Sequence, residues 1–163
     1  MMTDTMIRNG NVLTAPTNLT GELTESLVGS VADFPVARSK VIFTNREGGL
    51  ENWDEREVIF REDTSQRLAI VSNRYSLVTN RECFHLVENA ITDAGITDIR
   101  CGVSVIGNGR KFKALYVLPE CSYEVGTDDT LCCTILVTGS YDGTTRLVLE
   151  VGAYRFVCTN LST

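Results

Sequence analysis

Residues able to act as nucleophiles, acid–base catalysts or metal ligands are few in this sequence, and their spacing suits none of these tasks. His85 is the only histidine, and Cys83 lies two residues before it on a predicted helix. A nucleophilic thiol and its imidazole base must lie about 3 Å apart, whereas positions i and i+2 of a helix do not face each other. A catalytic site would instead require folding to bring Cys158, Asp142 and His85 together. We therefore expect a non-enzymatic protein with no catalytic residue.

Motifs typical of metal or nucleotide cofactors are also missing from the sequence. No two cysteines form a C-x-x-C pair, so a zinc ribbon is not indicated. Gly107-Asn108-Gly109 lacks both the third glycine and the following helix of a dinucleotide site. We predict no metal site and no cofactor, and we expect the thiols to pack in the core. The six cysteines are Cys83, Cys101, Cys121, Cys132, Cys133 and Cys158.

The strongest binding feature is a group of cations with no acid among them between positions 100 and 113. Its members are Arg100, Arg110, Lys111 and Lys113. A hairpin turn at Gly107-Asn108-Gly109 would place these charges near its tip, where they could hold a phosphate backbone while Tyr116 stacks on a base. The alternative is that the basic residues only keep exposed strands from pairing with neighbouring chains.

The overall charge limits the kind of nucleic-acid contact that is possible. The chain has 163 residues, of which 15 are Lys or Arg and 21 are Asp or Glu, and its net charge is −6. A negative protein repels polyanions on average, so a nucleic-acid contact must be local. The apolar share of 43% is typical of a globular domain, and no apolar run approaches the roughly 20 residues of a membrane helix. Met1-Met2-Thr3-Asp4 is unlike a secretory signal, so we expect a cytoplasmic protein with reduced thiols and no membrane contact.

Two helices are predicted. Thr79-Asn80-Arg81-Glu82 is a capping box, in which the threonine hydroxyl and the glutamate carboxylate each accept a backbone N–H, and Gly95 should end the helix that begins there. A shorter amphipathic helix is expected over residues 24–32, where Leu27, Val28 and Val31 follow a helical spacing. Residues 1–23 show no sustained apolar period and are predicted to be a flexible N-terminal arm.

The rest of the chain is predicted to form short strands in an α+β fold with a mainly antiparallel sheet. Residues 47–63 are rich in acids and are expected to be a solvated loop between strands. Asn-Gly and Asp-Gly steps predict two β-hairpins, one turning at 107–109 and one at 141–143. Residues 24–163 are thus expected to be a single domain. The predicted strands cover residues 40–43, 57–60, 67–71, 99–105, 110–118, 131–138 and 146–158.

The last predicted strand is apolar on both faces but carries Arg155. In a central strand this guanidinium must be paired, because an unpaired buried charge costs several kcal/mol. The arginine is therefore either one half of a structural ion pair or a binding-site residue.

Several short motifs, taken in order, resemble the prokaryotic phage/plasmid-like protein family, a domain of unknown function numbered 932. The likeness spans about residues 53–160, and the family residues that carry over are Arg110, Asp142, Arg155, Cys158 and Asn160. The resemblance implies an origin in a mobile element and the cytoplasm of its host, and it gives no role to these residues. The motifs are Asn73-Arg74-Tyr75-Ser76-Leu77-Val78, Asn108-Gly109-Arg110-Lys111-Phe112, Tyr141-Asp142-Gly143-Thr144 and Arg155-Phe156-Val157-Cys158-Thr159-Asn160.

Two functions follow from these features. The first is a phage or plasmid accessory protein that binds or anneals single-stranded DNA through the basic hairpin. The second is an acidic interaction protein without nucleic-acid activity, which assembles with itself or binds a host factor. The expected partners are accordingly single-stranded DNA, a second copy of the chain or another protein.

Overall fold

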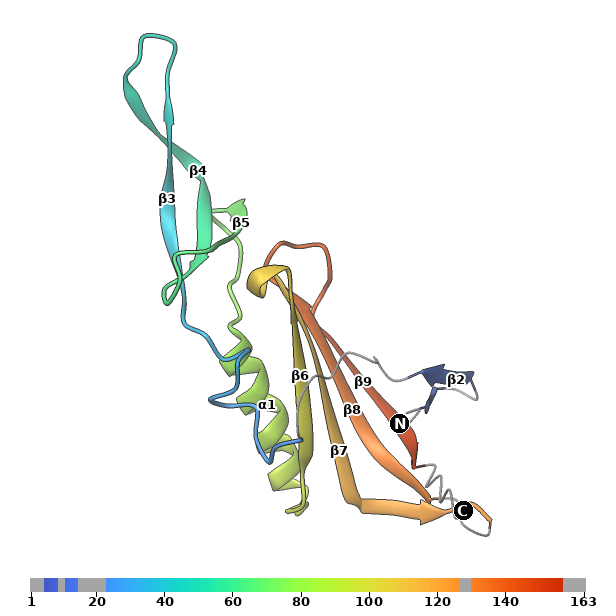
Figure 1. Ribbon diagram of the computed structural model, residues 1–163. Coiled ribbons are helices and arrows are strands. Elements are labelled where there is room, and N and C mark those ends of the chain that lie inside the picture. The colour runs from blue at the N-terminus through green and yellow to red at the C-terminus, as the bar shows by residue number, and fades with distance from the viewer. Residues whose placement is uncertain (1–4, 9–10, 15–22, 127–129, 157–163) are drawn as a thin grey trace, which may run out of the picture.

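The computed structural model describes residues 5–8, 11–14, 23–126 and 130–156, which form two antiparallel sheets and one α-helix (Figure 1). The mainly antiparallel α+β class is thus confirmed. The large sheet has the strand order β2-β1-β9-β8-β7-β6 and the small sheet the order β3-β4-β5. The elements are β1 (Thr5–Arg8), β2 (Asn11–Thr14), β3 (Val36–Thr44), β4 (Leu50–Arg61), β5 (Arg67–Ser72), α1 (Asn80–Asp93), β6 (Arg100–Ile106), the 3₁₀ turn η1 (Gly107–Gly109), β7 (Lys111–Glu124), β8 (Thr130–Ser140) and β9 (Val148–Phe156).

Strands β6 to β9 run back and forth across the large sheet, each paired with the next in sequence. Both predicted hairpins are present in this arrangement. The first reverses through η1, where Gly107, Asn108 and Gly109 have φ angles of 63°, 59° and 105°. The second connects β8 to β9 through residues 141–147. Positive φ angles at glycine and asparagine are what such tight reversals require, so these local signals placed the hairpins correctly.

Helix α1 begins and ends as its sequence predicts. The Glu82 N–H donates to the Thr79 hydroxyl at 3.2 Å, and the Thr79 N–H donates to the Glu82 carboxylate at 2.7 Å. Gly95, with φ of 80°, follows the last turn. The helix lies alongside β6 (Figure 1), and its apolar stripe packs against one side of the large sheet. This main core includes Leu27, Phe84, Val87, Ile91, Cys101, Phe112, Ala114, Tyr116 and Val137.

The predicted helix over residues 24–32 is absent, and this part of the chain forms turns. Ser30 donates its N–H to the Leu27 carbonyl at 3.0 Å, and Gly29 has a φ of 84°, which reverses the chain. The Ser26 hydroxyl accepts the Val28 N–H at 3.1 Å. Serine side chains that bind nearby backbone in this way compete with helical hydrogen bonds, so the apolar spacing alone was misleading.

The strand predicted over residues 57–60 is confirmed as part of β4, but the prediction of a solvated loop over the rest of residues 47–63 is wrong, because β4 already begins at Leu50. Strand β4 pairs with β3 on one side and β5 on the other. Its acidic side chains can pair with basic side chains of the neighbouring strand, as in the hydrogen bond of 2.6 Å from Arg38 Nε to Glu57 Oε2. Acid-rich sequence therefore marked an exposed ribbon and not an irregular segment.

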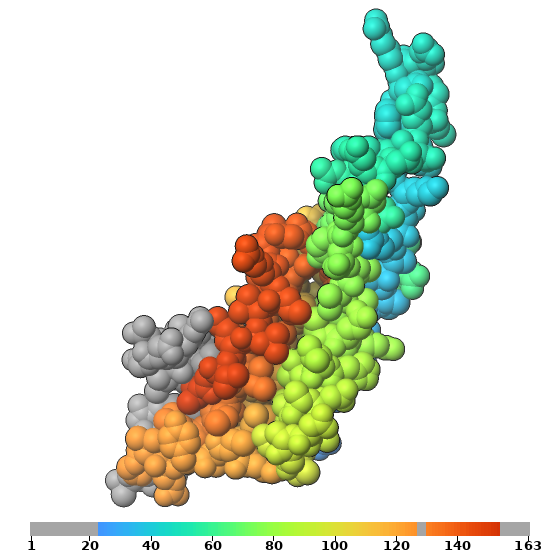
Figure 2. Space-filling model, turned by 180° about the vertical axis from the view of Figure 1, so that it is seen from behind, coloured from blue at the N-terminus to red at the C-terminus, as the bar shows by residue number. Residues whose placement is uncertain are grey.

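The outer part of the β3–β4 hairpin projects away from the rest of the molecule as a two-stranded ribbon (Figures 1 and 2). We call residues 41–54 the arm. Four of its large apolar side chains, Ile42, Phe43, Leu50 and Trp53, are exposed, and Leu50 reaches 76% of its full exposure. The base of the small sheet, in contrast, has its own core around Phe34, Ile59, Leu68 and Tyr141.

Residues 1–23, which the sequence predicts to be a flexible N-terminal segment distinct from the arm defined above, fall largely outside the described residues. Their flexibility stays a prediction. Within this segment, β1 pairs with β2 and also with β9.

Candidate functional site

The candidate site lies at the end of the large sheet where the turn of the first hairpin packs against the base of the small sheet. A Cβ added to Gly109 would lie 2.8 Å from Cζ of Phe34 and 3.2 Å from Cδ of Arg61, so only glycine fits this contact. The Arg61 guanidinium lies 3.9 Å from the centre of the Phe34 ring and forms a salt bridge with Asp63. The hairpin turn is therefore fixed in place by packing against both groups.

Cations gather at this end of the large sheet. Lys111 and Lys113 point to the side of the sheet away from α1, and Arg110 occupies the turn before them. Lys111 pairs in register with Ser140, whose hydroxyl accepts the Thr145 N–H at 3.0 Å. This contact holds the next residue, Arg146, near the same end of the sheet. In the part of the chain that the structure describes, none of these four cations forms a salt bridge.

Two of the predicted nucleic-acid residues do not belong to this group. Arg100 lies at the other end of β6, about 20 Å along the strand from the turn, and it pairs with Asp98 at 3.2 Å. Tyr116 is 0% exposed on the helix-facing side, where its hydroxyl donates to Glu88 at 3.1 Å. The prediction that Tyr116 stacks on a base is therefore wrong, because strand alternation turns its ring into the core.

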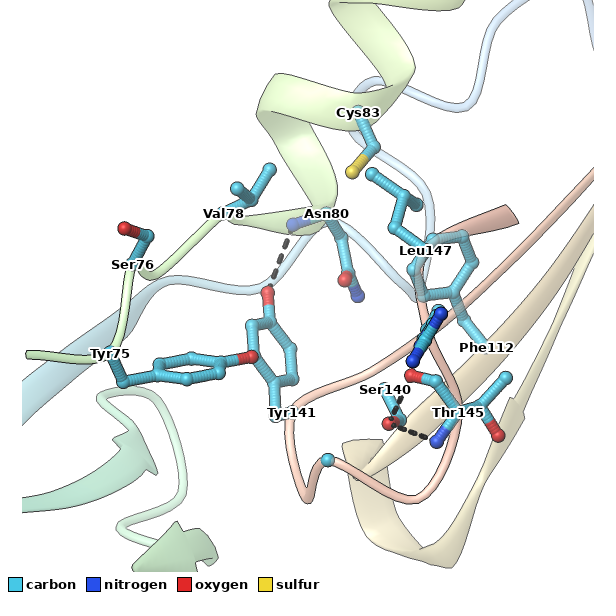
Figure 3. A pocket seen from close by; sticks show the side chains of 13 residues that line it. Tyr75, Ser76, Val78, Asn80, Cys83, Phe112, Ser140, Tyr141, Thr145 and Leu147 are labelled. Atoms are coloured by element: carbon cyan, nitrogen blue, oxygen red, sulfur yellow. Dashed lines mark hydrogen bonds between the residues drawn. The ribbon is translucent and has the colours of Figure 1, made fainter. Parts of the chain in front are cut away.

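A pocket of about 330 Å³ opens at the same end of the sheet but on its α1 side, below the start of the helix (Figure 3), and Arg146 is the one of the four cations that lines it. Three segments far apart in sequence form its walls, and three of the lining side chains are aromatic. The lining residues are Tyr75, Ser76, Val78, Asn80, Cys83, Phe112, Gly139, Ser140, Tyr141, Gly143, Thr145, Arg146 and Leu147.

Asn80 is the most deeply buried polar residue of this pocket, with 3% exposure. Its backbone N–H donates to the Tyr141 hydroxyl at 2.9 Å, and its Nδ2 donates to the Ala32 carbonyl at 2.9 Å. Its Oδ1 accepts no hydrogen bond from any residue that the structure describes. Burial raises the pKa of Tyr141, and the hydrogen bond from Asn80 lowers it by less, so this phenol stays protonated.

The pocket lacks the features of a nucleophilic site. Burial is the main cause that raises the pKa of the Cys83 thiol above its ordinary value, so this sulfur is a poor nucleophile at neutral pH. His85 is exposed two residues further along α1. Among the described residues, no group of three or more His, Cys, Asp or Glu side chains is arranged to hold a metal ion.

The structure describes the side chains of only some of the family-motif residues. Asp142 accepts the Thr144 N–H at 2.9 Å and so shapes the loop before β9. Burial raises the pKa of its carboxyl, and hydrogen bonds from Thr144 outweigh this and leave the pKa below its usual value. The backbone of Arg155 pairs with Leu131 and Thr5, but its side chain lies outside the described part. Cys158 and Asn160 also lie outside the described residues.

The sequence did not reveal Tyr75, Asn80 or Arg146 as site residues. A signal was nevertheless present, because two of the motifs that carry the family resemblance contain Tyr75 and Tyr141, and both motifs line the pocket. Asn80 was noticed only as part of the helix cap.

The one helix that the structure describes spans 14 residues and is neither long nor apolar enough to cross a membrane. In comparisons with known proteins, no curated protein and no solved structure matches the chain. A family model does match over residues 67–162, more than half of the chain, and this region includes every lining residue of the pocket. The chain therefore belongs to the family described as a domain of unknown function (DUF932).

Proposed function

We propose that this protein is a non-enzymatic module that binds single-stranded nucleic acid at the end of its large sheet. The observation that carries this proposal is that Arg110, Lys111, Lys113 and Arg146 lie at the one end of the large sheet that also holds an aromatic-lined pocket, with Arg146 in the lining. Lys and Arg side chains free of salt bridges are available to contact phosphates, and aromatic rings accept bases that are not stacked in a duplex. As an accessory protein of a phage or plasmid, it would bind or anneal strands in the host cytoplasm.

The charge distribution supports a small and salt-sensitive contact. The chain as a whole has a net charge of −6, so attraction of a polyanion must come from a local group of cations such as this one. Four phosphate contacts on a single strand predict a slope of about −3 in a plot of log affinity against log salt concentration. Binding should accordingly be measurable at low salt and weak at physiological salt.

The test is a fluorescence anisotropy titration with a labelled oligothymidylate of about 20 nucleotides at several salt concentrations. The variant Lys111→Ala/Lys113→Ala should reduce the slope by about half, since two of four contacts are lost. Arg100→Ala is the matched control, because Arg100 lies at the far end of β6 and is already paired with Asp98. The absence of salt-dependent binding by the unmodified protein at low salt would rule out the proposal.

A second candidate function is self-association through the arm. Ile42, Phe43, Leu50 and Trp53 are large apolar side chains that the arm leaves exposed. Strand β3 is also an edge of the small sheet and could pair with a second copy. Sedimentation velocity of the unmodified chain and of Leu50→Ser tests this candidate, which requires a dimer or larger species that the substitution weakens.

A further inference from the structure

We infer that the pocket below α1 receives one unstacked nucleobase, with the 5′-phosphate of the same nucleotide at Arg146. This inference deepens the proposed function, since the strand held by the cations would supply the nucleotide. The pocket then has a role of its own, because phosphate contacts alone would not require a pocket.

The size and walls of the pocket suit a planar aromatic ligand. Its volume of about 330 Å³ is at the small end of the range for ligand sites. Phe112 forms one wall and is held by an edge-on contact with Phe84, with ring centres 5.5 Å apart. A Cβ added to Gly139 would lie only 2.8 Å from Cε1 of Phe112, so any larger residue at this position would clash with the ring. Tyr75 and Tyr141 lie on the opposite side of the pocket (Figure 3).

Asn80 identifies the polar group that the ligand must present. Its side chain reaches from the helix start toward the space between Tyr141 and Phe112 (Figure 3). The Nδ2 atom donates to the Ala32 carbonyl, whereas the Oδ1 atom has no donor among the described residues and is not one of the fully buried unpaired atoms, so a ligand in the pocket could donate to it. Each common nucleobase carries an N–H group on its pairing edge and can supply that donor.

Tyr141 adds a second polar contact of fixed character. Its hydroxyl oxygen already accepts the Asn80 N–H at 2.9 Å, and its own proton has no acceptor among the described residues. The hydroxyl can therefore donate to a carbonyl oxygen or ring nitrogen of the ligand. The pocket thus offers an acceptor and a donor close together, as the pairing edge of a base does.

Arg146 determines that the ligand is a nucleotide and not a neutral aromatic molecule. It lines the pocket, is exposed to solvent, and has no salt bridge with any described residue. A guanidinium binds a phosphate through two parallel hydrogen bonds. Lys111 pairs in register with Ser140, six residues before Arg146, so the next phosphates of a strand could pass around this end of the sheet toward Arg110 and Lys111 on its other side.

The experiment is isothermal titration calorimetry of the full chain with each of the four deoxynucleoside 5′-monophosphates. Leu147→Trp should fill the pocket and reduce the affinity at least tenfold. Leu149→Trp is the matched control, because Leu149 lies two residues further on, inside β9, is similarly exposed and does not line the pocket. Arg146→Ala should lower the affinity for the monophosphates about tenfold and leave the affinity for the corresponding nucleosides unchanged. Deoxyribose 5-phosphate, which has no base, should bind at least tenfold more weakly.

The outcomes separate this inference from the proposed function. If no mononucleotide binds, if deoxyribose 5-phosphate binds as well, or if both tryptophan variants behave alike, the pocket is not a base site. Salt-dependent oligothymidylate binding could then still hold and would leave the proposed function intact. If mononucleotides bind in the pocket but no oligonucleotide binds, the proposed strand binding fails while the nucleotide site stands.

Discussion

The hydroxyl oxygen of Tyr141 accepts a hydrogen bond of 2.9 Å from the backbone N–H of Asn80, and so joins the loop before β9 to the first residue of α1. The Tyr141 ring also lies 6.2 Å, centre to centre, from Phe34 in the core of the small sheet. One side chain thus contacts three parts of the fold. The relative positions of the helix start, the β8–β9 loop and the small sheet depend on it.

Replacing Tyr141 with phenylalanine should lower the free energy of unfolding by about 1–3 kcal/mol, because the buried Asn80 N–H loses its acceptor. Urea unfolding followed by circular dichroism measures the change. Tyr123→Phe is the control, since Tyr123 is exposed near the end of β7 and should be nearly neutral. Equal effects of the two substitutions would show that the Asn80 contact contributes nothing.

Glu88 should be the most important acid for the stability of the main core. Its carboxylate accepts hydrogen bonds from the Leu27 N–H at 2.8 Å, the Tyr116 hydroxyl at 3.1 Å and the Ser26 hydroxyl at 2.6 Å. Removing it leaves the phenol of fully buried Tyr116 without a partner. Glu88→Ala should therefore cost at least about 2 kcal/mol, whereas its exposed neighbour Asn89→Ala should cost much less. Thermal unfolding of the two variants gives the comparison.

Asp33 should make stability depend on pH in acid. Burial raises the pKa of its carboxyl, but hydrogen bonds from Arg81 and the Gly29 N–H lower it more, so the folded pKa lies below 3.8. The stabilisation is then complete above the unfolded pKa and is lost as pH falls through the lower folded value. The stability difference between the unmodified protein and Asp33→Asn should be present at pH 7 and shrink below pH 4.

Denaturant unfolding at pH values from about 2 to 7 checks this expectation. Glu124→Gln serves as the control, because Glu124 is exposed and its carboxylate has no hydrogen bond to a described residue. A difference for Asp33→Asn that stays constant down to the lowest pH would contradict the assignment.

The core thiols should resist labelling in the folded protein. Burial is the main cause that raises the pKa of Cys101 to about 11, so only about one molecule in a thousand carries its thiolate at pH 8. Mass spectrometry after brief treatment with iodoacetamide should find Cys101 and Cys83 unmodified until denaturant is added. Rapid modification of Cys101 under native conditions would mean that this part of the core opens readily.

The sequence predicted those parts of the fold that depend on neighbouring residues. The capping box at Thr79 and the turns at Asn108 and Asp142 act within a few residues, and all three were placed correctly. The division into two sheets was not predicted, because strand pairing depends on contacts between distant segments.

The candidate site was only partly predictable for the same reason. Lys111 and Lys113 were recognised because charge is visible in the sequence. The pocket was not, because Tyr75, Phe112 and Tyr141 meet only after folding. Tyr116 was misassigned because the sequence shows which residues share a side of a strand but not which side the helix covers.

The arm has an optical consequence. Trp53, the only tryptophan of the chain, lies on it with 44% exposure and a guanidinium contact from Arg56. Indole emission therefore monitors a peripheral ribbon, whereas the change in tyrosine absorption on unfolding comes mainly from the buried rings of Tyr116 and Tyr141, since Tyr123 is already exposed. Because a ribbon with few buried contacts can open without the rest of the domain, emission and tyrosine absorption should report two separate melting events.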